Sequence, residues 1–502
     1  MTQPRTSSVE LTSTVCDSCR ERKQKCDKRW PTCSRCERLL LKCCYAVPTT
    51  ARGPWIPPDE GLLFQSLTTP EHALAQDLNR VPDWSMSSLS HIASLVSKHR
   101  RQIEILAQEF LMSCQKWFPI VHRDTFANRY HPALSHGARD SNTLLLAMGL
   151  VTRPFVDKLR EPIYNATKRL FWDPEAMASP TLHLIQAGLL LSVHEYGQGL
   201  LNASYLTISV CISMAYVVGI RPTQSPPPFP VSGSWSPSEA GLRTWWAIAI
   251  HERMISLKSG FPTRPLQLCN MDILDNRDID SEVQEIIRNV VSNPLYDHFV
   301  LQTRAAIWLD VVLELVQSSS TMSPEGRLHF QLVDRSLLVF LQSLVHLGLG
   351  YCCEAIAISL SAFVHLHKWR LTSPSPAFSQ QERFESSTAI KTILTVLSDL
   401  ALDRLRDGSP EENEYLYTEQ FPYFIHMAYQ VMVEILRVRR ISQISSNTFE
   451  AQKSMIWRIL QTQSTRWKIA GLFFRPIYLL PPGSPRILTY LGDYLTELHG
   501  ML

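Results

Sequence analysis

The sequence predicts two folds in succession: a small cysteine-rich module near the N-terminus, then a large all-α domain. Six of the 12 cysteines fall within residues 16–43. From about residue 89 onward, apolar residues recur at helical spacing, as in Val300, Ile307 and Val311, and sustained strand-like alternation is absent. Apolar residues make up 45% of the chain, so a domain of this length can bury a large core.

The cysteines of the N-terminal module form a two-fold repeat. Each member of the first half recurs 17 positions later: Cys16, Cys19 and Cys26 as Cys33, Cys36 and Cys43. A disulfide framework would need an oxidising compartment, and residues 1–15 lack the apolar core of a signal peptide. We therefore expect reduced thiols that bind metal.

The number of thiols selects the kind of metal site. Zinc takes four ligands in a tetrahedron, so six cysteines are too many for one zinc site and too few for two separate sites. Six are sufficient for two zinc ions if two of the sulfurs each bridge both metals. The repeat fits this symmetric arrangement, with one bridging thiolate from each half. A zinc ribbon on the first two cysteines of each half is the alternative, and it would leave Cys26 and Cys43 without a role. The predicted fold class is thus a small metal-nucleated binuclear zinc cluster with two zinc ions, followed by a large all-α domain.

Positive charge is concentrated in the same stretch. Residues 16–45 carry nine Lys and Arg against four Asp and Glu, and a core of six thiolates with two zinc ions leaves the module at +3. The whole chain of 502 residues also carries +3. The positive potential therefore belongs to the module, as expected of one that binds phosphate, although a nuclear import signal or a solvated face would also be basic.

The spacing C-x2-C-x6-C-x6-C-x2-C-x6-C resembles the DNA-binding domain of the fungal binuclear zinc cluster transcription factors. Pro31 also matches a proline that the family places between the two halves. The resemblance implies six zinc ligands: Cys16, Cys19, Cys26, Cys33, Cys36 and Cys43. It also implies that Cys16 and Cys33 bridge the metals. Cys44 is compatible with a looser last spacing that the family allows, but the 17-residue repeat favours Cys43.

The same resemblance implies a role for the basic residues. In the family each C-x2-C opens a short helix, and the first helix presents its end to the DNA major groove. By position, Lys23 matches the lysine that reads the guanines of a CGG triplet, with Arg22 beside it. Phosphate contacts are expected from Lys25, Lys28, Arg29 and Arg38. Arg20 completes the predicted DNA-binding set.

Composition divides the chain into four segments. We expect a disordered tail at residues 1–15, the zinc cluster at 16–45, a Pro-rich linker at 46–88 and an all-α regulatory domain at 89–502. The linker has no clean heptad run. The nearest candidate follows it, with apolar residues at alternating four and three spacing from Ile92, and lasts under three heptads. Packing inside a globular domain is favoured for this helix.

Two stretches without charged residues, 196–220 and 336–353, are long enough to cross a membrane. Polar residues interrupt both of them, and neither has a strong asymmetry of flanking charge. We therefore expect buried core helices and no membrane partner.

A second resemblance lies in the middle of the chain, to the middle homology region of many fungal zinc cluster factors. It rests on Arg243, Trp245, Trp246, Glu252, Arg253, Gly260 and Pro262. The chain departs from that pattern at Phe261, where arginine is preferred, and at Glu252, where aspartate is preferred. A physical interpretation stands beside it, in which the two tryptophans build a helix core and Glu252 pairs with Arg253.

The sequence contains no H-E-x-x-H, G-x-S-x-G, P-loop or G-x-G-x-x-G motif, so we expect no enzyme. It predicts a nuclear, sequence-specific regulator of RNA polymerase II transcription that recognises CGG-like triplets in double-stranded DNA as a homodimer. A likeness to regulators of fungal metabolism suggests a metabolic or secondary-metabolite gene cluster as the target. The alternative is a zinc-binding ligand sensor or zinc store without specific DNA readout, and a small-molecule effector is left open.

Overall fold

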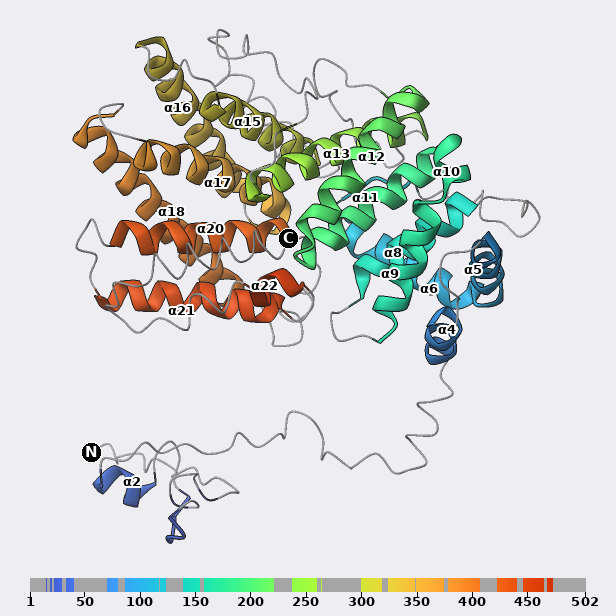
Figure 1. The fold of residues 1–502 in the computed structure, drawn as a ribbon. Coiled ribbons are helices and arrows are strands. Elements are labelled where there is room, and N and C mark those ends of the chain that lie inside the picture. The colour runs from blue at the N-terminus through green and yellow to red at the C-terminus, as the bar shows by residue number, and fades with distance from the viewer. Residues whose placement is uncertain are drawn as a thin grey trace, which may run out of the picture. The chain divides into compact units, whose positions relative to one another are not determined.

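The computed structural model describes the chain in segments (Figure 1). The described residues are 15, 19, 22–28, 33–39, 70–79, 86–116, 118–122, 139–153, 158–220, 237–259, 263, 299–317, 324–347, 349–373, 378–406, 422–439, 446–464 and 467–472. The chain divides into two compact units, Met1–Ala73 and Leu74–Leu502.

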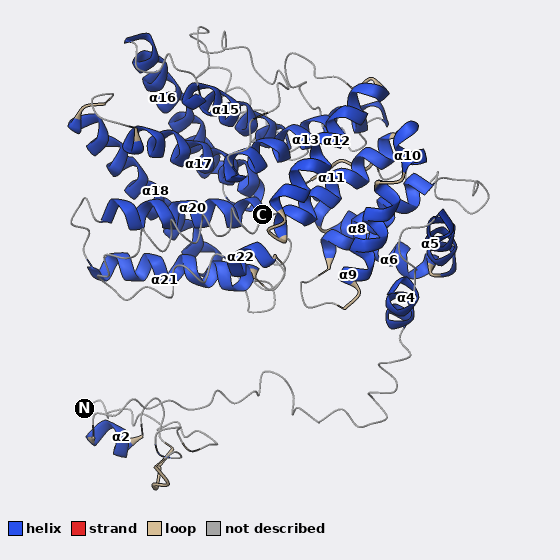
Figure 2. Ribbon diagram, viewed as in Figure 1, coloured by secondary structure: helices blue, strands red, loops and turns tan. Residues whose placement is uncertain are grey.

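Every regular element in the described part of the chain is a helix (Figure 2). The N-terminal module contains α2 (Ser34–Arg38). The remaining elements are α4 (Pro70–Asn79), α5 (Met86–Lys98), α6 (Arg100–Met112), η1 (Cys114–Lys116), α8 (Arg139–Thr152), α9 (Arg160–Phe171), α10 (Pro174–Ala178), α11 (Leu182–Gly197), α12 (Leu201–Val218), α13 (Pro237–Ser259), α15 (Phe299–Gln317), α16 (Pro324–Leu347), α17 (Leu349–Thr372), α18 (Gln380–Arg406), α20 (Pro422–Arg439), α21 (Ser446–Gln463) and α22 (Lys468–Leu472). The predicted all-α class is confirmed.

Two central helices organise the large unit. Helix α11 packs against α8, α9, α12 and α13, while α17 packs against α15, α16, α18 and α20. Residues Leu184–Gly197 of α11 are all buried, and so are Cys352–Val364 of α17. A largely apolar helix that is buried around its whole circumference lies in the middle of a domain. Helices α13 and α15 pack against each other and connect the two groups.

Local sequence accounts for several helix ends. The hydroxyl of Thr181 accepts a hydrogen bond from the backbone N–H of Leu184 at 3.3 Å and caps α11. Asp173 caps α10 in the same way, with Pro174 in the first helical position. Helix α12 ends at Gly219, whose φ of 82° lies in the left-handed region that glycine adopts without strain.

The helical part begins earlier than the predicted boundary at residue 89. Helix α4 lies inside the segment expected to be a linker, and Leu74 and Leu78, one helical turn apart, are buried in the core of the large unit. His99, which lies between α5 and α6, also forms a hydrogen bond with Asp77 of α4, with 2.8 Å between His99 Nε2 and Asp77 Oδ2. The sequence around α4 is rich in proline, and Leu74 and Leu78 give only one turn of apolar pattern. Composition alone therefore placed the start of the helical domain after α4.

The short heptad-like pattern after the linker belongs to the core. Ile92 and Val96 of α5, and Ile103, Leu106 and Phe110 of α6, are all buried. The prediction that this segment packs inside the globular domain is confirmed.

Both uncharged stretches are buried on one face only. In the second, Leu337, Phe340 and Leu344 lie in the core, but Leu338 is 41% exposed. The first contains α12, which among the described helices is the one long and apolar enough to cross a membrane. One face of α12 is buried against α11 and α13, but only 44% of the helix is buried, and Leu206 and Val217 are 58% and 73% exposed. The prediction of a buried core helix therefore holds for one face of α12 and is wrong for the other.

Candidate metal centre and nucleic-acid interface

Within the first half of the cysteine repeat, a helical turn ends at Lys23. Cys19 has helical backbone, and its carbonyl accepts a hydrogen bond from the N–H of Gln24 at 2.9 Å. Lys23, between them, has φ of 50°. A six-to-one backbone bond that encloses a left-handed residue is the Schellman arrangement that terminates helices. Lys23 therefore lies just beyond the end of the first helical turn, and its side chain is exposed.

The second half of the repeat begins with α2. The Sγ of Cys33 accepts a hydrogen bond from the backbone N–H of Cys36 at 3.4 Å, so Cys33 caps the N-terminus of this helix. The carboxylate of Asp27 accepts a hydrogen bond from the backbone N–H of Ser34 at 3.1 Å and another from the Ser34 hydroxyl. Asp27 was not predicted as a structural residue, because it lies seven positions before Ser34 and outside the spacing of a local capping motif. Its bond connects the loop of the first half to the helix of the second.

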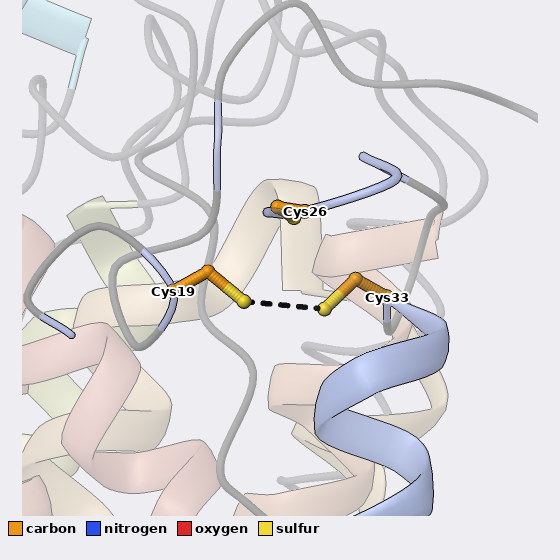
Figure 3. A group of neighbouring side chains, drawn as sticks. All are labelled: Cys19, Cys26 and Cys33. Atoms are coloured by element: carbon orange, nitrogen blue, oxygen red, sulfur yellow. Dashed lines mark hydrogen bonds between the residues drawn. The ribbon is translucent and has the colours of Figure 1, made fainter. Parts of the chain in front are cut away.

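The described sulfurs gather at one point (Figure 3). The Sγ of Cys19 lies 3.8 Å from that of Cys33 and 3.9 Å from that of Cys36. The Sγ atoms of Cys19, Cys26 and Cys33 lie within 4.8 Å of one another. Two thiolates on one tetrahedral zinc, each about 2.3 Å from the metal, are about 3.8 Å apart. The donor set and its spacing fit zinc.

The environment of Cys33 favours the thiolate that zinc requires. Burial raises the pKa of Cys33, but the N–H of Cys36 and the neighbouring thiols lower it, with a net value of about 6. Only the deprotonated sulfur is a ligand, so a lowered pKa assists metal binding at neutral pH.

Four of the six predicted ligands are among the described residues, and two are not. Cys16 and Cys43 lie outside the described residues, as does Cys44, so the bridging role of Cys16 stays a prediction. Cys26 joins Cys19 and Cys33 in one group. A ribbon on the first two cysteines of each half has no place for Cys26, so this grouping favours the six-thiolate cluster.

The basic residues surround this sulfur core at the surface. Arg22, Lys23, Lys25 and Arg38 are exposed, whereas Lys28 is half-buried. Arg20 and Arg29 lie outside the described residues. Lys28 has φ of 58°, so Lys23 and Lys28 are the described non-glycine residues with a left-handed backbone.

The middle homology residues have a structural role in the large unit. Arg243, Trp245 and Trp246 on α13 are buried. Arg253 forms ion pairs with Glu252 on the same helix and with Asp310 on α15. The predicted helix core and ion pair are both confirmed, while Gly260, Phe261 and Pro262 lie outside the described residues.

Comparison with known domain families gives two matches in this chain. Residues 14–52 match the fungal Zn(2)-Cys(6) binuclear cluster domain, and residues 107–294 match the fungal specific transcription factor domain. The first covers the whole cysteine repeat. The second includes the middle homology residues on α13.

Three curated relatives share parts of the chain. Transcription factor BOA15 of Botryotinia fuckeliana (strain B05.10) is 27% identical over 24% of this chain and 68% of its own length. The depudecin biosynthesis cluster-specific transcription activator DEP6 of Fusarium langsethiae is 43% identical over 15% of this chain. The uncharacterized transcriptional regulatory protein YLL054C of Saccharomyces cerevisiae (strain ATCC 204508 / S288c) is 32% identical over 18% of it. The chain spans 12% and 10% of the latter two proteins. No solved structure matches.

The domain matches agree with the described structure. The cysteines gather where the cluster domain matches, and the regulatory match falls on helices of the large unit. The cluster domain binds two zinc ions. The chain thus carries, in order, a fungal binuclear zinc cluster domain and a fungal specific transcription factor domain, and these domains are typical of a class of transcription factors and not of enzymes.

Proposed function

We propose that the chain acts in the nucleus as a regulator of RNA polymerase II transcription that reads CGG-like triplets in double-stranded DNA. The observation that supports this proposal most strongly is the position of Lys23. Its backbone is held in a left-handed conformation at the end of a helical turn that carries a metal ligand, and its side chain is exposed. A cation fixed at a helix end can enter the major groove, where guanine offers O6 and N7 as acceptors.

The other cations have a different role in this proposal. Arg22 is exposed beside Lys23 and would share the base contact, while Lys25 and Arg38, also exposed, would bind phosphates. Lys28, Arg20 and Arg29 complete the interface as predicted from the sequence. Zinc supplies the rigid frame that holds the two halves together, and the cations do the binding.

A single module of this size can read only a short site, so we propose a homodimer that reads two triplets. Linking two weak sites raises affinity through effective concentration. The large helical unit would then serve regulation, with any small-molecule effector unidentified.

The target genes are proposed from the relatives. The similarity to a cluster-specific activator of depudecin biosynthesis, 43% over 78 residues, supports a metabolic or secondary-metabolite gene cluster.

Selection from a random DNA library tests the proposal. The full zinc-loaded chain is incubated with random duplexes at about physiological salt, and bound sequences are enriched over several rounds. We expect CGG triplets to dominate, and we expect mapping of bound sites in the source genome to find them upstream of neighbouring biosynthetic genes. Enrichment without any preferred sequence would contradict the proposed function, because a zinc store or generic basic patch binds all duplexes alike.

A further inference from the structure

Basic side chains from α13, α17 and α20 form a cluster inside the large unit. Lys258 lies in the last turn of α13, and His426 lies on α20. His365 and Lys368 are three residues apart on α17 and therefore share one side of that helix. Helices α17 and α20 pack directly against each other. These four residues are the basic cluster.

Two contacts between α13 and α20 fix the position of the basic cluster. His251 Nδ1 lies 2.8 Å from the hydroxyl oxygen of Tyr423. Two turns further along both helices, Lys258 Nζ lies over the ring of Tyr429, 4.6 Å from its centroid. His426 is midway between the two tyrosines on α20, so it lies on the side of this helix that carries both contacts.

The basic cluster extends from the surface to a fully buried imidazole. Lys258, His365 and Lys368 are half-buried and reach solvent, whereas His426 is 0% exposed. The Nε2 of His426 is buried and has no hydrogen-bond partner among the described residues. A buried polar atom without a partner is destabilising, which indicates that its partner comes from outside the chain.

The other ring nitrogen of His426 determines where its proton lies. His426 Nδ1 is 2.8 Å from the hydroxyl oxygen of Tyr196, a buried residue on α11. This hydroxyl makes no other hydrogen bond within the described part of the chain, so it donates its proton to Nδ1. A neutral imidazole that accepts at Nδ1 carries its own proton on Nε2. His426 therefore presents a buried N–H donor that requires an acceptor.

The charges that act within the basic cluster are all positive. Burial and the charge of Lys368 lower the pKa of Lys258 to about 7 and that of His365 to about 4. Burial also lowers the pKa of His426, and so do the charges of the other three members. Glu354, the acidic residue of α17, lies eleven positions before His365, about 16 Å along the helix axis. An anion at the cluster would relieve this repulsion.

We propose that the basic cluster binds the phosphate or carboxylate group of a small molecule. The ammonium groups of Lys258 and Lys368 bind the oxyanion from the solvent side, and the Nε2–H of His426 donates a hydrogen bond to it from below. Hydrogen bonds from charged donors to an oxyanion are among the strongest in proteins. The oxyanion also supplies the acceptor that His426 lacks.

Binding at this position would affect the packing of the large unit. Helix α13 packs against α11, whereas α17 and α20 belong to the other group of helices. An oxyanion held by all three helices stabilises the packing of the two groups, because a ligand that binds only the folded state raises its stability. In the proposed function this molecule is the small-molecule effector, and in that respect alone the inference rests on the proposed function.

Thermal unfolding of the full zinc-loaded chain tests the site. Inorganic phosphate and succinate are titrated separately at constant ionic strength set with chloride, and the midpoint is followed by helical circular dichroism. A saturable rise with phosphate would identify a phosphorylated ligand, and one with succinate a carboxylic acid. Either response supports the proposal if the apparent dissociation constant is at least tenfold higher for Lys368→Met.

Lys391→Met is the matched control, because Lys391 is a half-buried lysine on α18 whose charge contributes to none of the lowered pKa values in the basic cluster. It should keep the affinity of the parent. Midpoints that rise equally in the parent and both variants would show a general effect of the salt. Midpoints that respond to neither oxyanion would show that water alone satisfies His426. Both outcomes overturn the proposal.

Nuclear magnetic resonance of histidine labelled with ¹⁵N tests the buried end of the site. The Nε2 resonance of His426, assigned by its loss in His426→Gln, should shift with the same oxyanion and saturate at the same concentration as the thermal midpoint. A resonance that does not shift would place the binding elsewhere and overturn the proposal.

The failure of this inference is distinguishable from failure of the proposed function. A parent that selects CGG triplets but responds to neither oxyanion contradicts the oxyanion site alone. A parent that binds an oxyanion at the basic cluster but selects no DNA sequence contradicts the proposed function alone.

Discussion

At the scale of single residues, the N-terminal module holds two lysines in a conformation that lysine seldom adopts. Lys23 and Lys28 have φ of 50° and 58°. A left-handed backbone at a residue with a side chain costs about 1–2 kcal/mol, so surrounding contacts must enforce it. At Lys23 the enforcing contact is the bond between Gln24 N–H and Cys19 carbonyl, and Cys19 belongs to the sulfur group. Metal binding and the direction of Lys23 are thus coupled through one backbone turn.

The identity of the sixth ligand is a prediction at this scale. Cys43→Ser should reduce bound zinc and abolish metal-dependent folding of the module, because Cys43 alone preserves the 17-residue repeat. Cys44→Ser, its adjacent control, should retain two zincs. Zinc content of the purified chains, measured by mass spectrometry under native conditions, checks this. The opposite result would mean that the cluster uses the longer last loop.

At the scale of helices, spacing predicted what is buried better than it predicted where elements begin. The pattern from Ile92 to Phe110 identified core positions, and the structure buries them. Helix α4 was missed because Leu74 and Leu78 provide a single turn of pattern among prolines. The exposed face of α12 was missed because an apolar residue in sequence carries no information on which neighbour covers it.

The sequence also predicted some features of the metal centre and missed others. Repeat spacing predicted that the cysteines gather, and Cys19, Cys26, Cys33 and Cys36 do so. The left-handed turn at Lys23 and the cap from Asp27 could not be predicted, because both arise from backbone geometry that exists only once the two halves are folded together.

The buried charges between α13 and α15 yield a prediction about stability. Arg253→Met removes the cation that pairs with Glu252 and Asp310, and breaking a buried ion pair by removing one partner costs about 3–5 kcal/mol. Urea unfolding of the large unit should show this loss. Arg100→Met is the control, since Arg100 and Glu104 form a partly exposed pair within α6 that contributes about 0.5 kcal/mol or less. Equal effects would mean that the buried pair is not a structural link.

Buried histidines make the large unit sensitive to mild acid. Burial lowers the pKa of His251 to about 3, and it also lowers the pKa of His194 and His426. The unfolded chain takes up these protons near pH 6.5, so it binds more protons than the folded state below that pH. Stability should therefore fall as the pH drops from 6.5 towards 4, by about 1.4 kcal/mol per pH unit for each histidine. Urea midpoints that stay constant between pH 7 and 5 would contradict this.

At the scale of the whole molecule, the two units have different sources of stability. The described core of the N-terminal module consists of Cys19, Cys33 and Cys36 with Val15 and Cys26 packed against them, which is too little apolar surface to fold without metal. The large unit has an extensive hydrophobic core of its own.

Removal of zinc should therefore unfold one unit and spare the other. A strong chelator is expected to abolish DNA binding and the dispersed amide signals of residues 10–50. Helical circular dichroism and the thermal midpoint of the large unit should not change. A module that stays folded after chelation would contradict its dependence on zinc. A large unit that unfolds with the module would show that its stability also depends on zinc.

The claim that the protein reads bases through Lys23 is tested most directly by comparing two lysines in the same module. Lys23→Ala and Lys28→Ala remove the same charge from the same left-handed backbone, so backbone strain and net charge are matched. The affinity of the full chain for a CGG duplex and for scrambled DNA is measured by fluorescence anisotropy over a range of salt, with zinc content confirmed for both. Lys23→Ala should cost about 1–3 kcal/mol on CGG alone and flatten the preference, whereas Lys28→Ala should weaken both duplexes alike and lower the salt slope by about one at most. Equal, sequence-independent losses for the two variants would contradict base reading through Lys23 and leave only a generic phosphate-binding surface.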